Sequence, residues 1–202
     1  MDKKATIQEF VDFVEGRMSF EEFWRNYETN LDYYRLLDDK RPNENFPYYK
    51  NDTICKCFTF YKNPLSSLGK SGIHHYVVRY LQYYNIPHIP TTKYRDDHRF
   101  RLDIQPSYVS IEDEEFLKPI IASTPEGLSS AQKKKWLKEK IKILFRYDKS
   151  PPRWVQWPEW PIVNGKPLVF KSQTKTTLAD ERVWYTFYDL DTKEEIVIEQ
   201  FY

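Results

Sequence analysis

The sequence predicts an α+β protein in which an N-terminal helical region packs on a small C-terminal antiparallel β meander. Apolar residues recur at helical spacing through much of residues 1–148, whereas apolar and polar residues alternate over 181–201. Between these patterns lies the stretch 151–161, whose four prolines and three tryptophans predict irregular or extended backbone. We therefore expect a mainly helical region at 1–148. A Trp/Pro-rich segment and the β meander should follow at 149–202, all within one compact unit.

Composition places the chain among globular proteins. Its 202 residues are 40% hydrophobic and 17% aromatic, which is enough to bury a core. The net charge of +1 offers no general attraction to nucleic acid or membranes. The N-terminus MDKKATIQEF lacks an apolar signal core, and no run of about 18 apolar residues occurs. Cys55 and Cys57 stand too close for an easy disulfide. These features predict a cytoplasmic protein with no membrane partner, and they leave the oligomeric state open.

The first forty residues predict a series of short helices. Apolar spacing indicates a helix at 6–15, which Gly16 ends. Ser19 and Glu22 have the spacing of a capping box at the start of a second helix. Asn30 is the expected N-cap of a third helix, which an Arg-Pro-Asn sequence stops.

The middle of the chain is less regular. Residues 43–65 fit a strand or a helix equally well. A helix is expected at 69–85, with Ser71 as its N-cap, and two prolines make the stretch 86–94 extended. Residues 96–108 fit either a short helix or a strand.

Two further helices precede the Trp/Pro-rich stretch. One is expected at 116–122, with the acidic run 112–115 near its N-terminus, where negative charge is stabilising. The other, at 129–147, begins with the capping-box pattern of Ser129 and Gln132.

Strand patterns dominate the last forty residues. Asn164-Gly165 is a turn signal, and the residues that follow it, 166–171, resemble a strand. Alternation predicts strands at 181–188 and 194–201, joined by a hairpin loop at 189–193. The result is a three-stranded antiparallel meander.

Candidate metal ligands and a candidate phosphate loop do not match known spacings. Cys55 and Cys57 could join His74 and His75 in a zinc site, but common zinc sites place two to four residues between cysteines. The sequence GKSG at 69–72 matches part of a phosphate-binding loop, yet a proline stands where that pattern needs its first glycine. The sequence therefore predicts no metal ligand and no cofactor-binding residue.

No residue pattern specifies a reaction. No serine or cysteine lies in a GxSxG context, although a catalytic pair assembled only in space stays open. A solvated or core position is the better interpretation of each histidine. We expect a protein that is not an enzyme and has no catalytic residues. The histidines are His74, His75, His88 and His98.

Three features are candidate contact surfaces. The helix at 129–146 carries six lysines, which fit a nucleic-acid surface or, preferably, the solvated face of an amphipathic helix whose Trp136 points inward. The tryptophans at 154, 157 and 160 either contact a partner or, as we favour, clamp the sheet to the helices. Some of six tyrosines are also candidates for an interface. They are Tyr33, Tyr34, Tyr48, Tyr49, Tyr83 and Tyr84.

The C-terminal quarter resembles a module of bacterial cytoplasmic proteins. The run PPRWVQWPEWPIVNGKPLVFKSQ, followed by ERVWYTFYDLDTKEEIVIEQ, is similar to PPxWxQxPEWPxxNGKPLxFxxQ with a β-hairpin and a terminal glutamine. The resemblance covers 151–200 and is weaker at TIQEFVDFVEGRMSFEEFW. Some groups with this module stand beside polymorphic toxins and are regarded as immunity proteins. Lys171 and Ser172 depart from the small apolar residue and glycine that relatives often have there, which would alter a partner contact. The resemblance implies no catalytic residue.

Together these features predict a cytoplasmic protein-binding protein that is not an enzyme. The resemblance implies a bacterial immunity protein that neutralises a toxin domain by occlusion. The alternative is a nucleic-acid-binding protein that uses the basic helix 129–146, which the near-zero net charge disfavours. An enzyme built from scattered His, Asp and Tyr residues would need a pocket where they converge.

Overall fold

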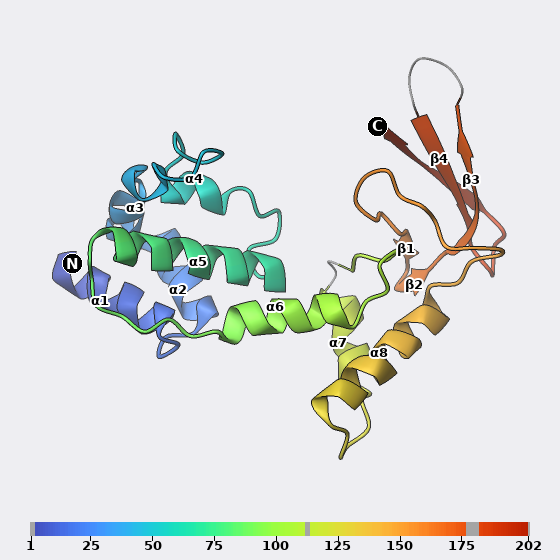
Figure 1. The fold of residues 1–202 in the computed structure, drawn as a ribbon, viewed down its shortest axis with the longest axis horizontal. Helices are drawn as coiled ribbons and strands as arrows, with labels where there is room; N and C mark the ends of the chain where they lie inside the picture. Colours follow the sequence, from blue (N-terminus) through green and yellow to red (C-terminus); the bar gives the residue numbers. More distant parts are fainter. Residues whose placement is uncertain (1–2, 112–113, 177–181, 202) are drawn as a thin grey trace. The chain divides into compact units, whose positions relative to one another are not determined.

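The computed structural model describes residues 3–111, 114–176 and 182–201. The chain divides into two compact units, Met1–Arg99 and Phe100–Tyr202, each with its own core. This boundary differs from the expected one at 148/149 because the helices at 114–122 and 130–144 share a core with the sheet. Helices make up the N-terminal part and an antiparallel sheet lies near the C-terminus, so the α+β class is confirmed (Figure 1).

The first unit is helical. Its elements are α1 (Lys3–Val14), α2 (Phe20–Thr29), α3 (Leu31–Leu37), the 3-10 helix η1 (Arg41–Asn43), α4 (Ile54–Phe58), α5 (Ser67–Tyr83) and the start of α6 (Lys93–Asp103). Helix α5 packs against both α1 and α4. The ring of Phe23 in α2 contacts those of Phe10 and Phe13 in α1, because helical spacing brings the two α1 side chains to one face of that helix.

Side-chain caps begin several of these helices. Ser19 Oγ accepts a hydrogen bond from Glu22 N at 3.1 Å, and Asn30 Oδ1 accepts one from the N–H two residues later, so both predicted caps are confirmed. The prediction of Ser71 as the cap of α5 is wrong. Ser66 Oγ caps that helix by accepting from Gly69 N at 3.1 Å. Helical bonding starts with Lys70 N donating to the carbonyl of the same serine, so Ser71 already lies inside the helix.

The glycines of the GKSG sequence serve packing rather than phosphate binding. A Cβ atom at Gly69 would lie 2.5 Å from the carbonyl oxygen of Asn63. A Cβ atom at Gly72 would lie 1.8 Å from the Tyr61 hydroxyl. Both positions lie within α5, where only glycine lets the preceding loop approach the helix this closely.

The stretches that the sequence left open take definite forms. Residues 44–52 form turns and bends, and Thr53 Oγ1 caps α4 by accepting from Lys56 N at 3.2 Å. Residues 86–92 contain no helix, in line with the expected extended stretch, and Thr91 N bonds to the carbonyl of Val14 at 2.9 Å. The segment 96–108 is helical as far as Asp103.

The second unit places helices against an antiparallel sheet of strand order β3-β4-β5, as the predicted meander has. The predicted first strand at 166–171 is wrong in its bounds, because residues 166–167 pair with 162–163 in a separate hairpin and the first strand of the meander is Val169–Lys175. The capping box of Ser129 and Gln132 is confirmed. Helix α8 ends three residues before the expected Tyr147, because the backbone at 146–148 pairs with Phe170 of β3 instead. The elements of the second unit are α7 (Glu114–Ala122), α8 (Ser130–Leu144), β1 (Ile162–Val163), β2 (Lys166–Pro167), β3 (Val169–Lys175), β4 (Arg182–Tyr188) and β5 (Glu195–Phe201).

The predicted turns join these strands. Asn164 and Gly165 have φ angles of 50° and 72°, the left-handed pair that a two-residue hairpin between β1 and β2 requires. Residues 189–194 connect β4 to β5. The predicted strand start at Glu181 lies outside the described residues.

Alternation along β4 gives the sheet two different faces. Val183, Tyr185 and Phe187 are buried in a core that they share with Leu137 and Ile141 of α8. The residues between them face the other side and are partly or fully accessible. Within the part of the chain that the structure describes, no helix has both the length and the apolar character needed to cross a membrane.

Candidate partner-binding surface

Two of the three tryptophans in residues 151–161, here called the Trp/Pro segment, belong to the core of the second unit. Trp160 is 6% exposed, its ring lies edge-on to Phe145 and Phe187, and its Nε1 donates to Leu168 O at 2.8 Å. Trp154 is half-buried, and its ring centroid lies 4.4 Å from that of Tyr185. These rings pack the segment on the buried face of the sheet, as the favoured interpretation of the sequence predicts.

Side chains from the sheet hold the backbone of this segment in place. Tyr185 Oη accepts from Val155 N at 3.0 Å and donates to Arg153 O at 2.9 Å. Gln173 Oε1 accepts from the N–H of the same arginine at 2.7 Å. Prolines remove backbone donors and prevent a regular ladder, so these side chains supply the hydrogen bonds that a neighbouring strand would otherwise supply.

Gln200 of β5 fixes the position of the remaining tryptophan. This glutamine is 1% exposed, accepts from Gln156 N at 3.1 Å and donates to Trp157 O at 2.8 Å. Gln156 Nε2 also donates to Phe201 O at 2.9 Å. The backbone on each side of Trp157 is thereby constrained, by these bonds before it and by Pro158 after it.

The Trp157 side chain itself is 80% exposed. Phe201, whose carbonyl is tied to the same segment, is 46% exposed. We call Gln156, Trp157 and Phe201 the Trp157 surface. The backbone that bears this exposed tryptophan is already ordered before a partner arrives, so binding does not incur the entropic cost of ordering that backbone. The sequence shows three tryptophans in this segment, but only the folded structure separates the exposed one from the other two.

The candidate tyrosines divide into core and surface residues. Tyr33 is fully buried in the first unit, so it is excluded from any interface. Two others, Tyr49 and Tyr84, are half-buried beside the same core. Tyr34, Tyr48 and Tyr83 are exposed, with Tyr48 the most exposed at 92%.

The cysteines have the character of inert core thiols. Cys55 and Cys57 are both buried and free. Burial raises the pKa of Cys55 to about 11, and burial also raises the pKa of Cys57. Thiols with raised pKa values form little thiolate at neutral pH and react slowly. Among the described residues, no three His, Cys, Asp or Glu side chains are grouped closely enough to hold a metal ion.

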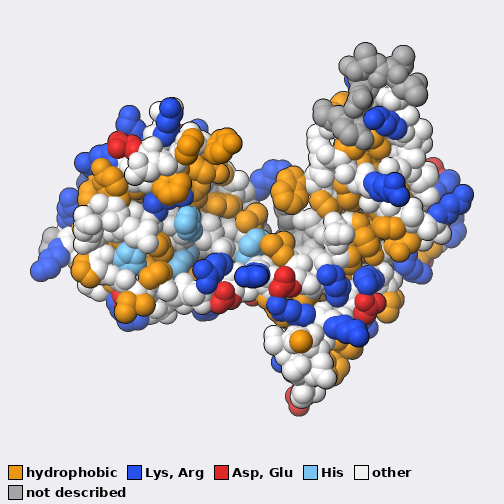
Figure 2. Space-filling view, viewed as in Figure 1, with side chains coloured by type: hydrophobic (Ala, Val, Ile, Leu, Met, Phe, Trp, Pro, Cys, Tyr) orange, Lys and Arg blue, Asp and Glu red, His pale blue; other side chains and the backbone are white. Residues whose placement is uncertain are grey.

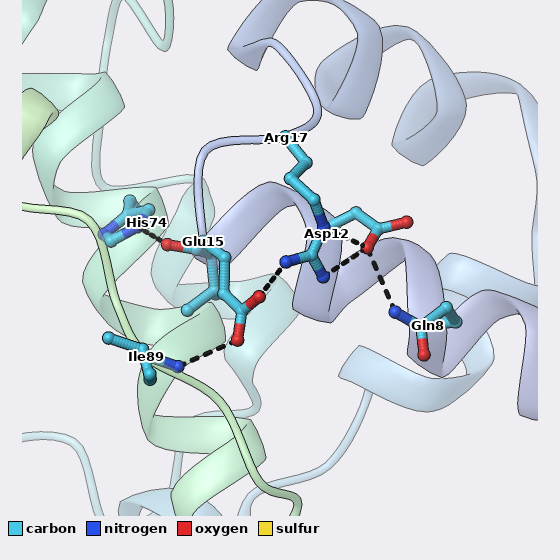
Figure 3. Close-up of polar contacts among 7 residues, drawn as sticks. Gln8, Asp12, Glu15, Arg17, His74 and Ile89 are labelled. Carbon is cyan, nitrogen blue, oxygen red and sulfur yellow. Dashed lines mark hydrogen bonds and ion pairs between the residues drawn. The ribbon is translucent and has the colours of Figure 1, made fainter.

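Two histidines line a cavity of about 400 Å³ in the first unit. His74 is buried, and its Nε2 donates to Val14 O at 3.0 Å, which ties α5 to the end of α1 (Figure 3). Beside it, Glu15 accepts from Ile89 N at 2.9 Å and also pairs with Arg17 (Figure 3). His75 lines the same cavity and accepts from Arg79 at 3.1 Å.

The hydrogen bond of His74 joins two helices, whereas that of His75 lies within α5. Ser71 lines the cavity beside His74, but the hydrogen bonds of the described residues include none between its hydroxyl and a histidine. Elsewhere in this unit, Ser67 Oγ lies 3.3 Å from His98 Nδ1, a pairing between α5 and α6 that sequence spacing does not indicate. Because the serine is the first residue of α5, its contact with His98 joins the start of α5 to α6.

His74 makes the first unit sensitive to acid. Burial lowers the pKa of His74, and the hydrogen bond to Val14 only partly opposes this effect. The unfolded chain therefore takes up the proton at higher pH than the folded one, so the free energy of unfolding should fall as pH drops below about 6.5. We expect a lower urea midpoint at pH 5.5 than at pH 7.5. His74→Gln, which keeps a donor, should show a smaller difference, and an unchanged difference would contradict this assignment.

The lysine-rich helix α8 is an amphipathic helix with a partly neutralised outer face. Trp136 is half-buried against the core, as predicted, with Lys140 Nζ 5.8 Å from its ring centroid. Lys134 pairs with Asp103 at 2.5 Å and Lys142 with Glu139 at 2.7 Å. On the face drawn in Figure 2, basic side chains of the second unit are scattered and acidic ones lie among them. This arrangement favours a solvated helix face over a phosphate-binding track.

Comparisons with known proteins return no match. No protein-family model matches the chain, no curated protein matches it, and no solved structure matches it. The family resemblance of residues 151–200 therefore stays a prediction.

Proposed function

We propose that this chain is a protein-binding protein, not an enzyme, and that it binds its partner through the Trp157 surface. One observation carries the proposal. Trp157 is 80% exposed, yet the backbone that bears it is held by Gln156 and Gln200. Tryptophan is enriched among residues that dominate binding energy, and rigid presentation reduces the cost of association.

The resemblance of residues 151–200 supports a narrower role. It suggests a bacterial cytoplasmic immunity protein whose partner is a toxin domain. Neutralisation would occur by occlusion, so the complex would be stoichiometric and would need no turnover. An interface of about 800 Å² on each partner is typical of stable complexes. The side chains around Trp157 would form its centre and the neighbouring charged residues its rim.

Trp157→Ala should abolish most binding while leaving the fold intact. Loss of a central tryptophan commonly costs about 2–4 kcal/mol of binding energy, which corresponds to a loss of affinity of about 30-fold or more. The test is capture by the tagged protein from lysate of its own cells, followed by titration calorimetry with the captured protein. Trp184→Ala is the matched control, because Trp184 is 37% exposed but lies on the opposite face of the sheet.

Three outcomes are informative. A protein that the wild type and Trp184→Ala capture, and that Trp157→Ala does not, supports the proposal. Equal capture by all three would show that Trp157 is not the anchor. Recovery of nucleic acid that disappears with nuclease or moderate salt would favour the alternative, binding through helix 129–146, which predicts steep salt dependence.

A further inference from the structure

A small cavity of about 320 Å³ lies in the second unit, between residues 149–153 and strand β3. Three basic side chains line it, from Lys149, Arg153 and Lys171. The hydroxyl-bearing residues Ser150 and Ser172 line it as well. We call this site the cationic cavity.

The walls of the cationic cavity are held by hydrogen bonds on both sides. Phe170, which is 3% exposed, donates from its N–H to Arg146 O at 2.9 Å and accepts from Asp148 N at 3.0 Å. Gln173 Oε1 accepts from Arg153 N at 2.7 Å, and the carbonyl of that arginine accepts from a buried tyrosine of β4. The backbone positions that carry the cations are therefore set before any ligand binds.

The side chains available in the cavity are hydrogen-bond donors. Among the described residues, Lys149 and Arg153 form no ion pair, and the hydroxyls of Ser150 and Ser172 have no hydrogen-bond partner. Lys171 pairs with Glu195 at 2.5 Å, and both side chains are about half exposed, so this pair is weak. An incoming anion would meet two unpaired cations and two hydroxyls, which suit the oxygens of an acidic group.

We infer that the cationic cavity binds a carboxylate, the acidic side chain of the protein partner. This inference rests on the proposed function and names the chemistry of that partner. Arg153 and Trp157 are four positions apart in the chain, so their Cα atoms are at most about 14 Å apart. One standard interface covers both positions, because each partner contributes a patch of about 800 Å².

The charges around the cavity favour a single acidic group over a polyanion. Glu159 is exposed on the same segment, two residues beyond Trp157. Glu195, which pairs with Lys171 of the cavity wall, and the nearby Asp148 raise the pKa of that lysine. A nucleic-acid backbone that entered the cavity would continue past these carboxylates, and like charges at short distance are unfavourable. A lone Asp or Glu side chain does not extend that far.

A short acidic peptide tests the cavity without the partner. The peptide acetyl-Gly-Gly-Glu-Gly-Gly-amide, which carries one carboxylate, is titrated into the ¹⁵N-labelled full chain at constant ionic strength. We expect saturable shifts of the amide signals of Ser172 and Gln173. The double variant Lys149→Gln/Arg153→Gln should lose at least about tenfold in affinity. The double variant Lys133→Gln/Lys138→Gln on α8 is matched in charge and should bind as the wild type does. Retained dispersion of the amide spectrum would show that each variant is folded.

The results separate this inference from the proposed function. Equal peptide binding by both double variants, or an absence of saturable shifts, overturns the carboxylate site. Tighter binding of a six-nucleotide thymidylate than of the single-glutamate peptide overturns it in favour of a phosphate ligand. Trp157→Ala should bind the peptide normally, because the peptide tests only the cavity. Failure of partner capture by Trp157→Ala is then a separate result that concerns the proposed function alone.

Discussion

Asn43→Ala is expected to lower the free energy of unfolding of the first unit by about 3–5 kcal/mol. Asn43 is fully buried, and its Oδ1 accepts from Arg79 Nη1 at 2.7 Å. Its Nδ2 donates to Asp52 O at 2.8 Å and contacts Cys57 Sγ at 3.4 Å. The alanine variant would leave a buried guanidinium with one acceptor fewer and a backbone carbonyl without its donor. Leaving a buried polar group unpaired costs more free energy than its hydrogen bond contributes when it is formed.

Arg79 makes this cost large because no carboxylate pairs with it among the described contacts. Its side chain is 8% exposed, stacks at 3.5 Å on the ring of Phe46 and donates to His75. Its Nε has no hydrogen-bond partner, and burial lowers the pKa of the guanidinium. Among the described residues, Asn43 and His75 are the two neutral hydrogen-bond acceptors that compensate the buried charge of Arg79.

Urea denaturation measures the effect, with Asn45→Ala as the control. Asn45 is exposed, and its replacement should change the free energy of unfolding by less than about 0.5 kcal/mol. The cost of Asn43→Ala should shrink when Arg79→Met removes the charge as well, because the orphaned cation is then gone. A loss below about 1 kcal/mol for Asn43→Ala alone would show that the guanidinium reaches water, and would refute this account.

Trp160→Ala is expected to cost the second unit about 3–5 kcal/mol. The Trp160 ring lies among those of Phe145, Phe170 and Phe187, which come from the C-cap of α8, from β3 and from β4. Its removal would open a cavity that the surrounding elements cannot close without moving apart. It would also leave the carbonyl of Leu168 without the indole donor at 2.8 Å.

Near-UV circular dichroism and urea denaturation of the second unit test this prediction, and Trp157→Ala is its control. Trp157 has the same side chain three residues away, but it is exposed, so its replacement should change stability by less than about 0.5 kcal/mol. Similar losses for the two variants would mean that Trp157 packs against the protein in solution. That result would also remove the main support for the Trp157 surface.

The sequence by itself determined the features that depend on neighbouring residues. The capping box of Ser129 and Gln132 spans three positions, so its pattern is legible without a fold. The alternation of Val183, Tyr185 and Phe187 likewise identifies a half-buried strand, because side chains on a strand have a period of two. These local patterns were sufficient for the α+β class and for the meander at the C-terminus.

Only the tertiary structure decided which of these residues are accessible and which form a site. Trp157 and Trp160 have similar Trp-Pro contexts in the sequence, and only contacts with the sheet bury one and expose the other. Gln200 reaches Trp157 across 43 positions of the chain, and Arg79 reaches Asn43 across 36. No local pattern encodes such pairs, because their hydrogen bonds form only when burial removes competing water.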